Sequence, residues 1–505
     1  MEDAAGVQGS SPEASPRLIA MRILCLNPPF LPRFSRASRS PSVARSGTIY
    51  YPIWLCFATG NLEKAGHRVA LMDMPARGMT WEVLEKHIAD FAPEMVVMST
   101  STPSIANDCK VAAAIARLLP VKPIVAAGTH VTARPQDAFV PGSGFTIVMR
   151  GEYDETVVDL ADALEKGRDL SMVAGISYPS DGKLVSTPAR PLIEDLDSLP
   201  MLGKVIHDHL HVDDYFFAAA RYPMIMMITG RGCPNQCIFC VYPQTMHGRR
   251  YRLRSPESVA QEFAYIRENL PQIKEIVIED DTFTADLPRA HEISRLLIAT
   301  HNRIPWTINV RATLDLETMR LMRRAGCRTL VVGFESGDEG VLKAMHKNIT
   351  LGDQKQFARD AKLAGLLVHG CFMAGNPGET RQTLQRTLEQ ALKLDTDTAQ
   401  FFPLMVYPGT EVFEWASRNG YLRSTVWREW VDEEGKHRCM IDTPELSGVD
   451  LEEFCDYARG RYYKRISYIA GRLWLALRRP AEIPRLWKAF WIFLPKLRNS
   501  FWEQP

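Results

Sequence analysis

The stretch that decides the fold is "GRGCPNQCIFCVYPQ", residues 230–244, which places Cys233, Cys237 and Cys240 within eight residues of one another. It follows the apolar run "PMIMMITG" (223–230), which has the length and composition of a buried strand. Thiols gathered at the exit of a strand are not explained by packing alone. A site for a metal or a metal cluster is therefore the first hypothesis.

Zinc is one alternative for this group of thiols. Structural zinc takes four ligands, usually from two separated pairs, and no second pair follows these cysteines. His247 in "MHGRR" is a conceivable fourth ligand, but a single histidine in a basic loop is typical of a solvated or phosphate-facing residue. Three thiolates instead fit a [4Fe–4S] cluster held at three corners, whose fourth iron stays open for an external ligand.

The composition narrows the class of protein. A chain of 505 residues suits about two to four domains. Its 60 basic and 59 acidic residues nearly cancel, which argues against nucleic acid as a partner. Ten cysteines spread over so long a chain favour a reducing, cytoplasmic location, and the small, polar residues 1–20 predict a disordered leader.

Residues 21–165 alternate short apolar runs such as "RILCLN" (22–27) with amphipathic ones such as "WEVLEKHIADF" (81–91). This pattern predicts a doubly wound parallel sheet, whose ligands bind beyond the carboxyl ends of the strands. A regulatory domain without a cofactor would show the same pattern. The candidate binding residues at these ends are Asp73, Gly78, Ser99, Thr100, Gly128, Thr129, His130, Gly151 and Glu152.

The remaining chain divides into three parts. Residues 166–218, rich in proline and aspartate, predict a linker with a short hairpin. A second α/β series occupies residues 219–440, and residues 441–505 predict a helical region with a basic, aromatic tail. The cysteines outside the triad are interpreted as ordinary apolar thiols, except that Cys371 is expected just before a strand, facing a cavity.

The C-x3-C-x2-C spacing, with Phe239 before the third cysteine, resembles that of radical S-adenosylmethionine (SAM) enzymes. The resemblance implies a partial or complete β/α barrel, a [4Fe–4S] cluster on the three cysteines, and cleavage of SAM to a 5′-deoxyadenosyl radical. It also implies an external electron donor such as flavodoxin or ferredoxin, and a late strand within "VYPGTEVFEWASRNG" (406–420). The implied SAM-binding residues are Phe239, Asp280, Asp281, Arg311, Glu335 and Ser336.

The N-terminal domain resembles the cobalamin-binding domain that precedes the barrel in a subset of these enzymes, through "STSTPSIAND", "AAGTHVTARPQD" and "RGEYDET". The resemblance implies cobalamin at the strand ends named above. One position departs from the pattern, because "DMPARG" places Pro75 where D-x-H-x-x-G motifs carry the cobalt-binding histidine. A cobalamin bound here would have no histidine below it, and the alternative is a domain that kept the fold and lost the cofactor.

Segments such as "YYPIWL" (50–55) and "EDDTFTADLPRA" (279–290) are similar to the hopanoid-biosynthesis-associated branch. That similarity implies contraction of a sugar ring to the cyclitol ether of a bacteriohopanepolyol, on a lipid-linked or secondary-metabolite substrate. The alternative enzyme is a cobalamin-dependent C-methyltransferase. The alternative of another class is a non-catalytic cobalamin or redox sensor, against which the intact cysteine triad argues.

The tail after Arg461 interleaves arginines and lysines with tryptophans and leucines. Basic residues on one face and apolar ones on the other predict a helix lying in a membrane interface, and prolines cut it into segments too short to cross a bilayer. The alternative is a helical cap on the barrel. The first interpretation predicts a peripheral contact with the inner membrane.

Overall fold

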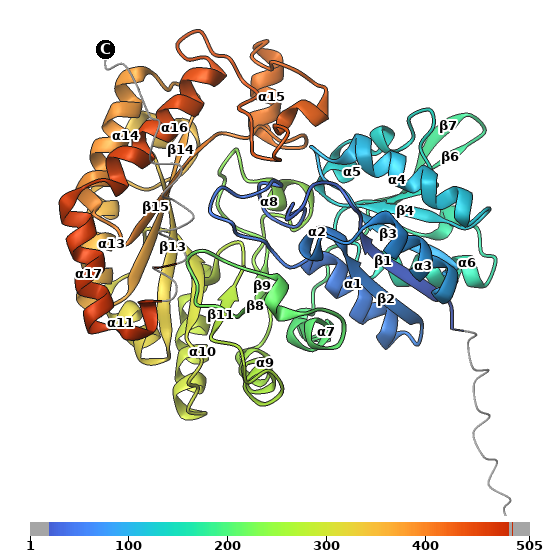
Figure 1. Cartoon of the computed structure of the whole chain (residues 1–505), viewed down its shortest axis with the longest axis horizontal. Coiled ribbons are helices and arrows are strands. Elements are labelled where there is room, and N and C mark those ends of the chain that lie inside the picture. The colour runs from blue at the N-terminus through green and yellow to red at the C-terminus, as the bar shows by residue number, and fades with distance from the viewer. Residues whose placement is uncertain (1–19, 484–486, 488–505) are drawn as a thin grey trace, which may run out of the picture.

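The computed structural model describes residues 20–483 and 487, which form two α/β units side by side (Figure 1). The N-terminal unit contains a seven-stranded sheet of order β2-β1-β3-β4-β5-β6-β7. Its strands are β1 (Arg22–Asn27), β2 (Arg68–Asp73), β3 (Met95–Ser99), β4 (Ile124–Ala127), β5 (Ile147–Met149), β6 (Ile176–Ser180) and β7 (Lys183–Ser186).

Strands β1 to β5 are parallel, as expected, and their apolar runs are continuous because helices cover both faces. Helices α1 and α6 pack on one face, and α3 and α4 on the other. The hairpin expected in the connecting segment is β6–β7, which extends this sheet in antiparallel fashion. The helices are α1 (Ile53–Lys64), α2 (Met74–Arg77), α3 (Trp81–Phe91), α4 (Ile105–Leu118), α5 (Thr129–Ala133) and α6 (Thr156–Glu165).

The second unit is built on a six-stranded parallel sheet of order β15-β14-β13-β12-β11-β8, in which β8 and β15 are the edges. It is therefore a partial barrel. A small antiparallel pair, β9 (Gly230–Arg231) and β10 (Arg252–Leu253), brackets the cysteine loop. The six strands are β8 (Met224–Met227), β11 (Glu275–Ile278), β12 (Trp306–Val310), β13 (Cys327–Glu335), β14 (Leu367–Ala374) and β15 (Thr398–Pro403).

Helices cover the outside of this sheet (Figure 1). Helix α9 begins as the sequence predicts, with Ser255 accepting a hydrogen bond from the Ser258 N–H at 3.1 Å and Pro256 at the first helical position. None of the described helices is long and apolar enough to span a bilayer. The helices are α7 (Leu202–His209), α8 (Val241–Thr245), α9 (Pro256–Asn269), α10 (Leu287–Ala299), α11 (Leu316–Arg324), α12 (Glu339–Ala344), α13 (Leu351–Ala364), α14 (Arg381–Leu394), α15 (Glu411–Arg418), α16 (Gly448–Tyr463) and α17 (Ile466–Arg478).

Two local expectations are wrong. Residues 406–420 contain helix α15 rather than a strand, because Gly409 turns the chain with φ +85° and Thr410 caps the helix by accepting a hydrogen bond from the Phe413 N–H. The late strand is β15, which ends before this segment. Cys371 lies inside β14 rather than before it, and its side chain is half-buried.

Candidate functional site

The three cysteines lie on the loop between β9 and α8, and all three are free thiols. The Asn235 amide donates to the Cys233 sulfur at 3.3 Å, and the Arg311 guanidinium donates to the Cys237 sulfur at 3.6 Å. Such donors stabilise a sulfur that carries negative charge, as in a cluster ligand. Cys233 and Cys237 thus have donors that suit a thiolate, whereas burial and the nearby Asp281 raise the pKa of the Cys240 thiol.

The three cysteines are candidate ligands for a [4Fe–4S] cluster. Among the described residues, no three His, Cys, Asp or Glu side chains converge closely enough to hold one metal ion. Zinc needs such convergence, whereas in a [4Fe–4S] cube each thiolate binds a different iron. Cys233, Cys237 and Cys240, which lie on one loop, are the residues that would hold three corners of such a cube.

Asp281 holds the cysteine loop in place. Its Oδ2 accepts hydrogen bonds from the Gly232 N–H at 3.0 Å and from His247 Nδ1 at 2.8 Å. Burial alone would raise the pKa of Asp281, but His247, Arg39 and the Gly232 N–H outweigh it and lower the pKa to about 2. The carboxylate is therefore ionised beside the loop that carries the cysteines.

The expectation that His247 is solvated is wrong. Its side chain is 2% exposed, stacks on Tyr242 and meets the edge of Trp54. Trp54 belongs to α1 of the other unit, so the burial arises from a contact that the local sequence does not contain.

Asp280 points into the interior. Its carboxylate accepts hydrogen bonds from the Thr229 N–H at 2.6 Å, the Thr229 hydroxyl at 2.5 Å and the Tyr251 hydroxyl at 3.0 Å, and burial raises its pKa. Both oxygens are thus engaged within the protein. Of the two predicted aspartates, Asp281 is the one whose carboxylate accepts a hydrogen bond from the cysteine loop, at the Gly232 N–H.

A buried ion pair joins the end of β13 to the cysteine loop. Glu335, at φ +66°, accepts a hydrogen bond from Lys347 Nζ at 2.7 Å, and this Nζ lies 5.9 Å from the centre of the Phe239 ring. Arg311 donates to the carbonyl of Lys347. Burial alone would lower the pKa of Lys347, but Glu335 outweighs it and raises the pKa. The structure therefore brings Phe239, Arg311 and Glu335 together around Lys347. No sequence pattern had pointed to Lys347.

Ser336 is not part of this group. It is fully buried, and its hydroxyl lies 3.1 Å from the Thr387 hydroxyl on α14. The register between β13 and β14 shifts between Gly333 and Glu335, which disturbs the alternation from which a side chain's direction is inferred.

Arg39 reaches from the N-terminal unit into the mouth of the barrel. Its Nη1 donates to Glu279 Oε2 at 2.6 Å, and its Nη2 donates to the Asp280 carbonyl at 2.9 Å. The Asn309 amide donates to the same Glu279 oxygen at 3.1 Å. No sequence pattern pointed to Arg39 or Asn309, because no spacing rule relates an arginine to an acid 240 residues away.

Two buried ion pairs connect the units beside the cysteine loop. Arg231 donates to both oxygens of Asp154 at 2.9 Å, and Arg252 donates to those of Glu152 at 2.8 and 2.6 Å. These side chains are at most 6% exposed. Glu152, a predicted cobalamin contact, is therefore occupied in joining the segment after β5 to the strands that flank the cysteines.

Small residues shape the carboxyl edge of the first sheet. Gly128 has φ +137°, and a Cβ there would lie 2.5 Å from the Thr100 carbonyl oxygen. Gly151 has φ +71°, and its N–H donates to the Thr132 hydroxyl at 3.0 Å. A Cβ at Gly151 would meet no atom within 4 Å, so the backbone there is open and leaves room for a large cofactor such as cobalamin. Ser99 and Thr129 are half-buried at this edge, Thr100 is buried there, and Gly78 ends α2 with φ +62°.

Asp73 and His130 are internal at the same edge. Asp73 accepts hydrogen bonds from Asn27 at 2.7 Å and Tyr215 at 2.9 Å, and burial raises its pKa to about 6. The ring nitrogens of His130 lie 3.1 Å from the Thr102 hydroxyl and 3.2 Å from Asp137, and burial lowers its pKa. The side chains of Asp73 and His130 thus form internal hydrogen bonds that stabilise the carboxyl edge of the first sheet.

Comparison with known proteins identifies both units. Family models of the radical SAM superfamily and the B12 binding domain match residues 227–391 and 39–161. An uncharacterized methyltransferase of Pyrococcus horikoshii is 34% identical, covering 76% of this chain and 82% of that protein. The anaerobic magnesium-protoporphyrin IX monomethyl ester cyclase of Rubrivivax gelatinosus is 26% identical, covering 72% and 66%. Hopanoid C-3 methylase of Methylococcus capsulatus is 24% identical, covering 90% and 86%.

A solved structure shows the same fold. The radical SAM methyltransferase TsrM from Kitasatospora setae, with cobalamin and a [4Fe–4S] cluster bound, superposes with a TM-score of 0.67 at 18% identity, covering 88% of this chain and 89% of that one. The chain belongs to the radical SAM enzymes that carry a B12 binding domain. Membership confirms the predicted cofactors, a [4Fe–4S] cluster, SAM and cobalamin.

Proposed function

We propose that the protein is a cobalamin-dependent radical SAM methyltransferase. The observation that carries this proposal is the pair of buried contacts, Arg231 with Asp154 and Arg252 with Glu152, that hold the first sheet's carboxyl edge against the cysteine loop. Methyl transfer through cobalamin requires the two cofactors to share one space. The methyltransferase relative at 34% identity supports the same reaction.

In this proposal each predicted domain binds its own cofactors. Cobalamin binds to residues 21–165, and the cluster and SAM bind to residues 219–440. When bound, these groups supply a methyl donor, a methyl carrier and a 5′-deoxyadenosyl radical. The chain's residues bind and orient them. We assign Cys233, Cys237 and Cys240 to the cluster, and Phe239, Asp281, Arg311 and Glu335 to SAM, with Lys347 orienting Glu335 and Arg39 closing the barrel mouth.

Methyl transfer is better supported than ring contraction in hopanoid synthesis. The names of three relatives or structural neighbours, those of Pyrococcus, Methylococcus and Kitasatospora, describe methyltransferases or a methylase. The proposed substrate is a small molecule, lipid-linked or a secondary metabolite. A flavodoxin or ferredoxin is the proposed electron donor.

The proposal is tested by incubating anaerobic, reconstituted and reduced protein with SAM that carries a deuterated methyl group. We expect the label on the bound cobalamin and, when host extract is added, on one extract component, both measured by mass spectrometry. Replacing Cys233, Cys237 and Cys240 with alanine should remove iron, sulfide and SAM cleavage, whereas Cys109→Ala should retain them. Unlabelled cobalamin in fully loaded protein would contradict methyl transfer.

A further inference from the structure

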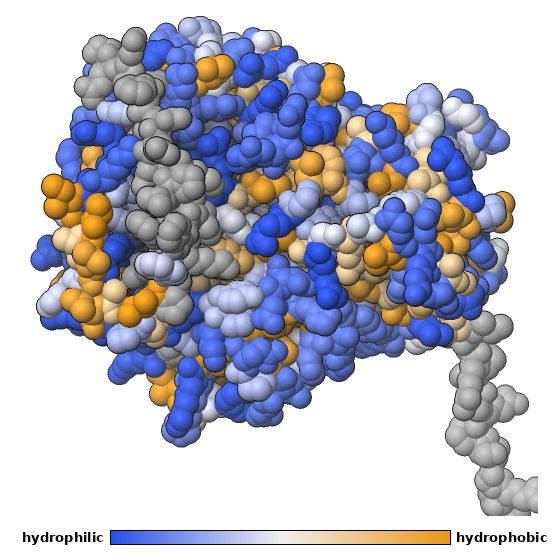
Figure 2. All heavy atoms as spheres, in the orientation of Figure 1, coloured by the Kyte–Doolittle hydropathy of each residue, from blue (hydrophilic) through white to orange (hydrophobic). Residues whose placement is uncertain are grey.

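Helix α17 presents an apolar ridge to solvent. Ile466, Ile469, Leu473 and Leu477 follow the spacing i, i+3, i+7 and i+11, which places them on one helix face. They are 86%, 50%, 64% and 76% exposed, and no residue of α17 is buried. Figure 2 shows apolar side chains gathered at the left edge of the molecule, where α17 lies in Figure 1.

The opposite face of α17 anchors the helix to the barrel. Arg472 donates to the Asp397 carboxylate at 2.8 Å, and the Tyr468 hydroxyl donates to the Asp397 carbonyl at 3.1 Å. Just beyond the helix, the buried Glu482 pairs with Arg328 at 3.0 Å. These contacts fix which face of α17 points outward, so the exposed ridge is a property of the fold.

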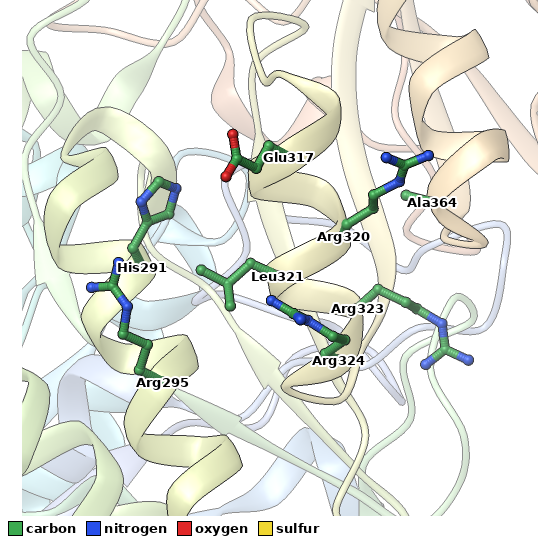
Figure 3. Close-up of a pocket in the computed structure, with 8 residues that line it drawn as sticks. All are labelled: His291, Arg295, Glu317, Arg320, Leu321, Arg323, Arg324 and Ala364. Atoms are coloured by element: carbon green, nitrogen blue, oxygen red, sulfur yellow. The ribbon is translucent and has the colours of Figure 1, made fainter.

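A basic pocket of about 530 Å³ lies between α10 and α11 (Figure 3). It borders the carboxyl end of α17, because Arg479 donates at 3.3 Å to the carbonyl of Gly365, next to Ala364 in the pocket wall. Desolvation and the nearby Arg479 lower the pKa of Arg323, as expected where positive charges crowd together. The charged or titratable residues that line the pocket are His291, Arg295, Arg320, Arg323 and Arg324, with Glu317 as the single acid.

We propose that the α17 ridge and the α10–α11 arginine pocket together dock the protein on an anionic lipid bilayer. An apolar helix face rimmed by arginines is the pattern of helices that lie in a membrane interface. Exposed apolar patches of this kind mark interaction surfaces. Trp474, 56% exposed with the Arg478 guanidinium 4.6 Å from its ring centre, adds a side chain suited to the headgroup layer.

Charge favours a bilayer over other occupants. A second copy of this surface would bring arginines against arginines. The following residues 484–486 and 488–505, which lie outside the described residues, contain Arg485, Lys488, Lys496 and Arg498 against Glu503, so they add positive charge rather than neutralise it. Each basic residue near an anionic surface contributes about fivefold in affinity. The docking surface is independent of the reaction proposed above.

Co-sedimentation of the full chain tests this surface, using phosphatidylcholine vesicles with and without phosphatidylglycerol. We expect binding to the anionic vesicles only, weakening as salt is added. The double change Leu473→Glu and Leu477→Glu should weaken binding at least about tenfold, because two apolar side chains no longer enter the interface. Met172→Glu, at a site 74% exposed on the other unit, is the matched control and should bind normally.

A separate variant tests the electrostatic contribution of the arginine pocket to vesicle binding. Arg320→Ala with Arg324→Ala should lower binding by roughly twentyfold or more at low salt, whereas Lys86→Ala with Lys110→Ala, both exposed on the first unit, should leave it unchanged. Circular dichroism should show unaltered folding for all variants, since every changed side chain is exposed. Three results would overturn the proposal. The Leu473→Glu, Leu477→Glu variant could bind as tightly as the wild type, or the wild type could bind neutral vesicles equally well. The third result is a wild-type dimer that dissociates in this variant.

Discussion

Replacing Arg231 with methionine should destabilise the protein by about 3–5 kcal/mol, because it leaves a buried charge without its partner. Arg231 is 1% and Asp154 is 6% exposed, and both Asp154 oxygens accept their hydrogen bonds from Arg231 at 2.9 Å. Methionine retains much of the arginine's volume against the Phe57 ring, 4.6 Å from the guanidinium. The loss of stability is therefore due to the unpaired Asp154 carboxylate rather than to a cavity.

Urea unfolding of the wild type and the variant, both without cluster, measures this loss. Adding Asp154→Leu to Arg231→Met should recover most of the stability, since the unpaired Asp154 charge is then removed, and Glu152, 3.6 Å from Arg231, keeps its pair with Arg252. Arg250→Met is the matched control, because Arg250 pairs with Glu194 at the surface, both more than 60% exposed, and it should cost roughly 0–1 kcal/mol. The reasoning fails if Arg231→Met costs less than about 1 kcal/mol, or if the double variant is no more stable than the single one.

Three further outcomes are expected. Gly333→Ala should destabilise the protein by about 1–3 kcal/mol in thermal unfolding, because a Cβ there would lie 2.1 Å from Glu335 Oε1. Gly471→Ala is the control. Gly471 lies in open space on α17, so alanine there should stabilise the protein by up to about 1 kcal/mol. Burial raises the pKa of Asp73 from 3.8 in the unfolded chain to about 6 in the folded protein. The protonated carboxyl therefore contributes its full stabilisation below the unfolded pKa, and this stabilisation is lost as the pH rises through the folded pKa. Between pH 4 and 7 the wild type should lose about 2–2.5 kcal/mol relative to Asp73→Asn in urea unfolding, and parallel pH profiles would contradict this. Paramagnetic resonance of the cob(II)alamin form should lack nitrogen splitting, because Pro75 stands where the motif has histidine, and a clear histidine splitting would refute it.

The features that the sequence determined are those encoded by near neighbours. The spacing of Cys233, Cys237 and Cys240 indicates a cluster because its ligands come from one short loop. The continuous apolar strands predict parallel sheets because both faces of such strands are covered. Ser255 and Pro256 mark the start of α9 because capping involves only the first turn.

The tertiary structure alone decided which side chains meet. Lys347 joins Glu335 to Phe239, Arg39 crosses from one unit to Glu279 in the other, and Trp54 buries His247. Each contact joins segments whose approach depends on the path of the whole chain, so no local pattern encodes it. Ser336, which the resemblance implied as a SAM contact, lies against Thr387 of α14. Periodicity and ligand spacing are local properties of a chain, whereas the pairing of buried charges follows from how the two units pack together.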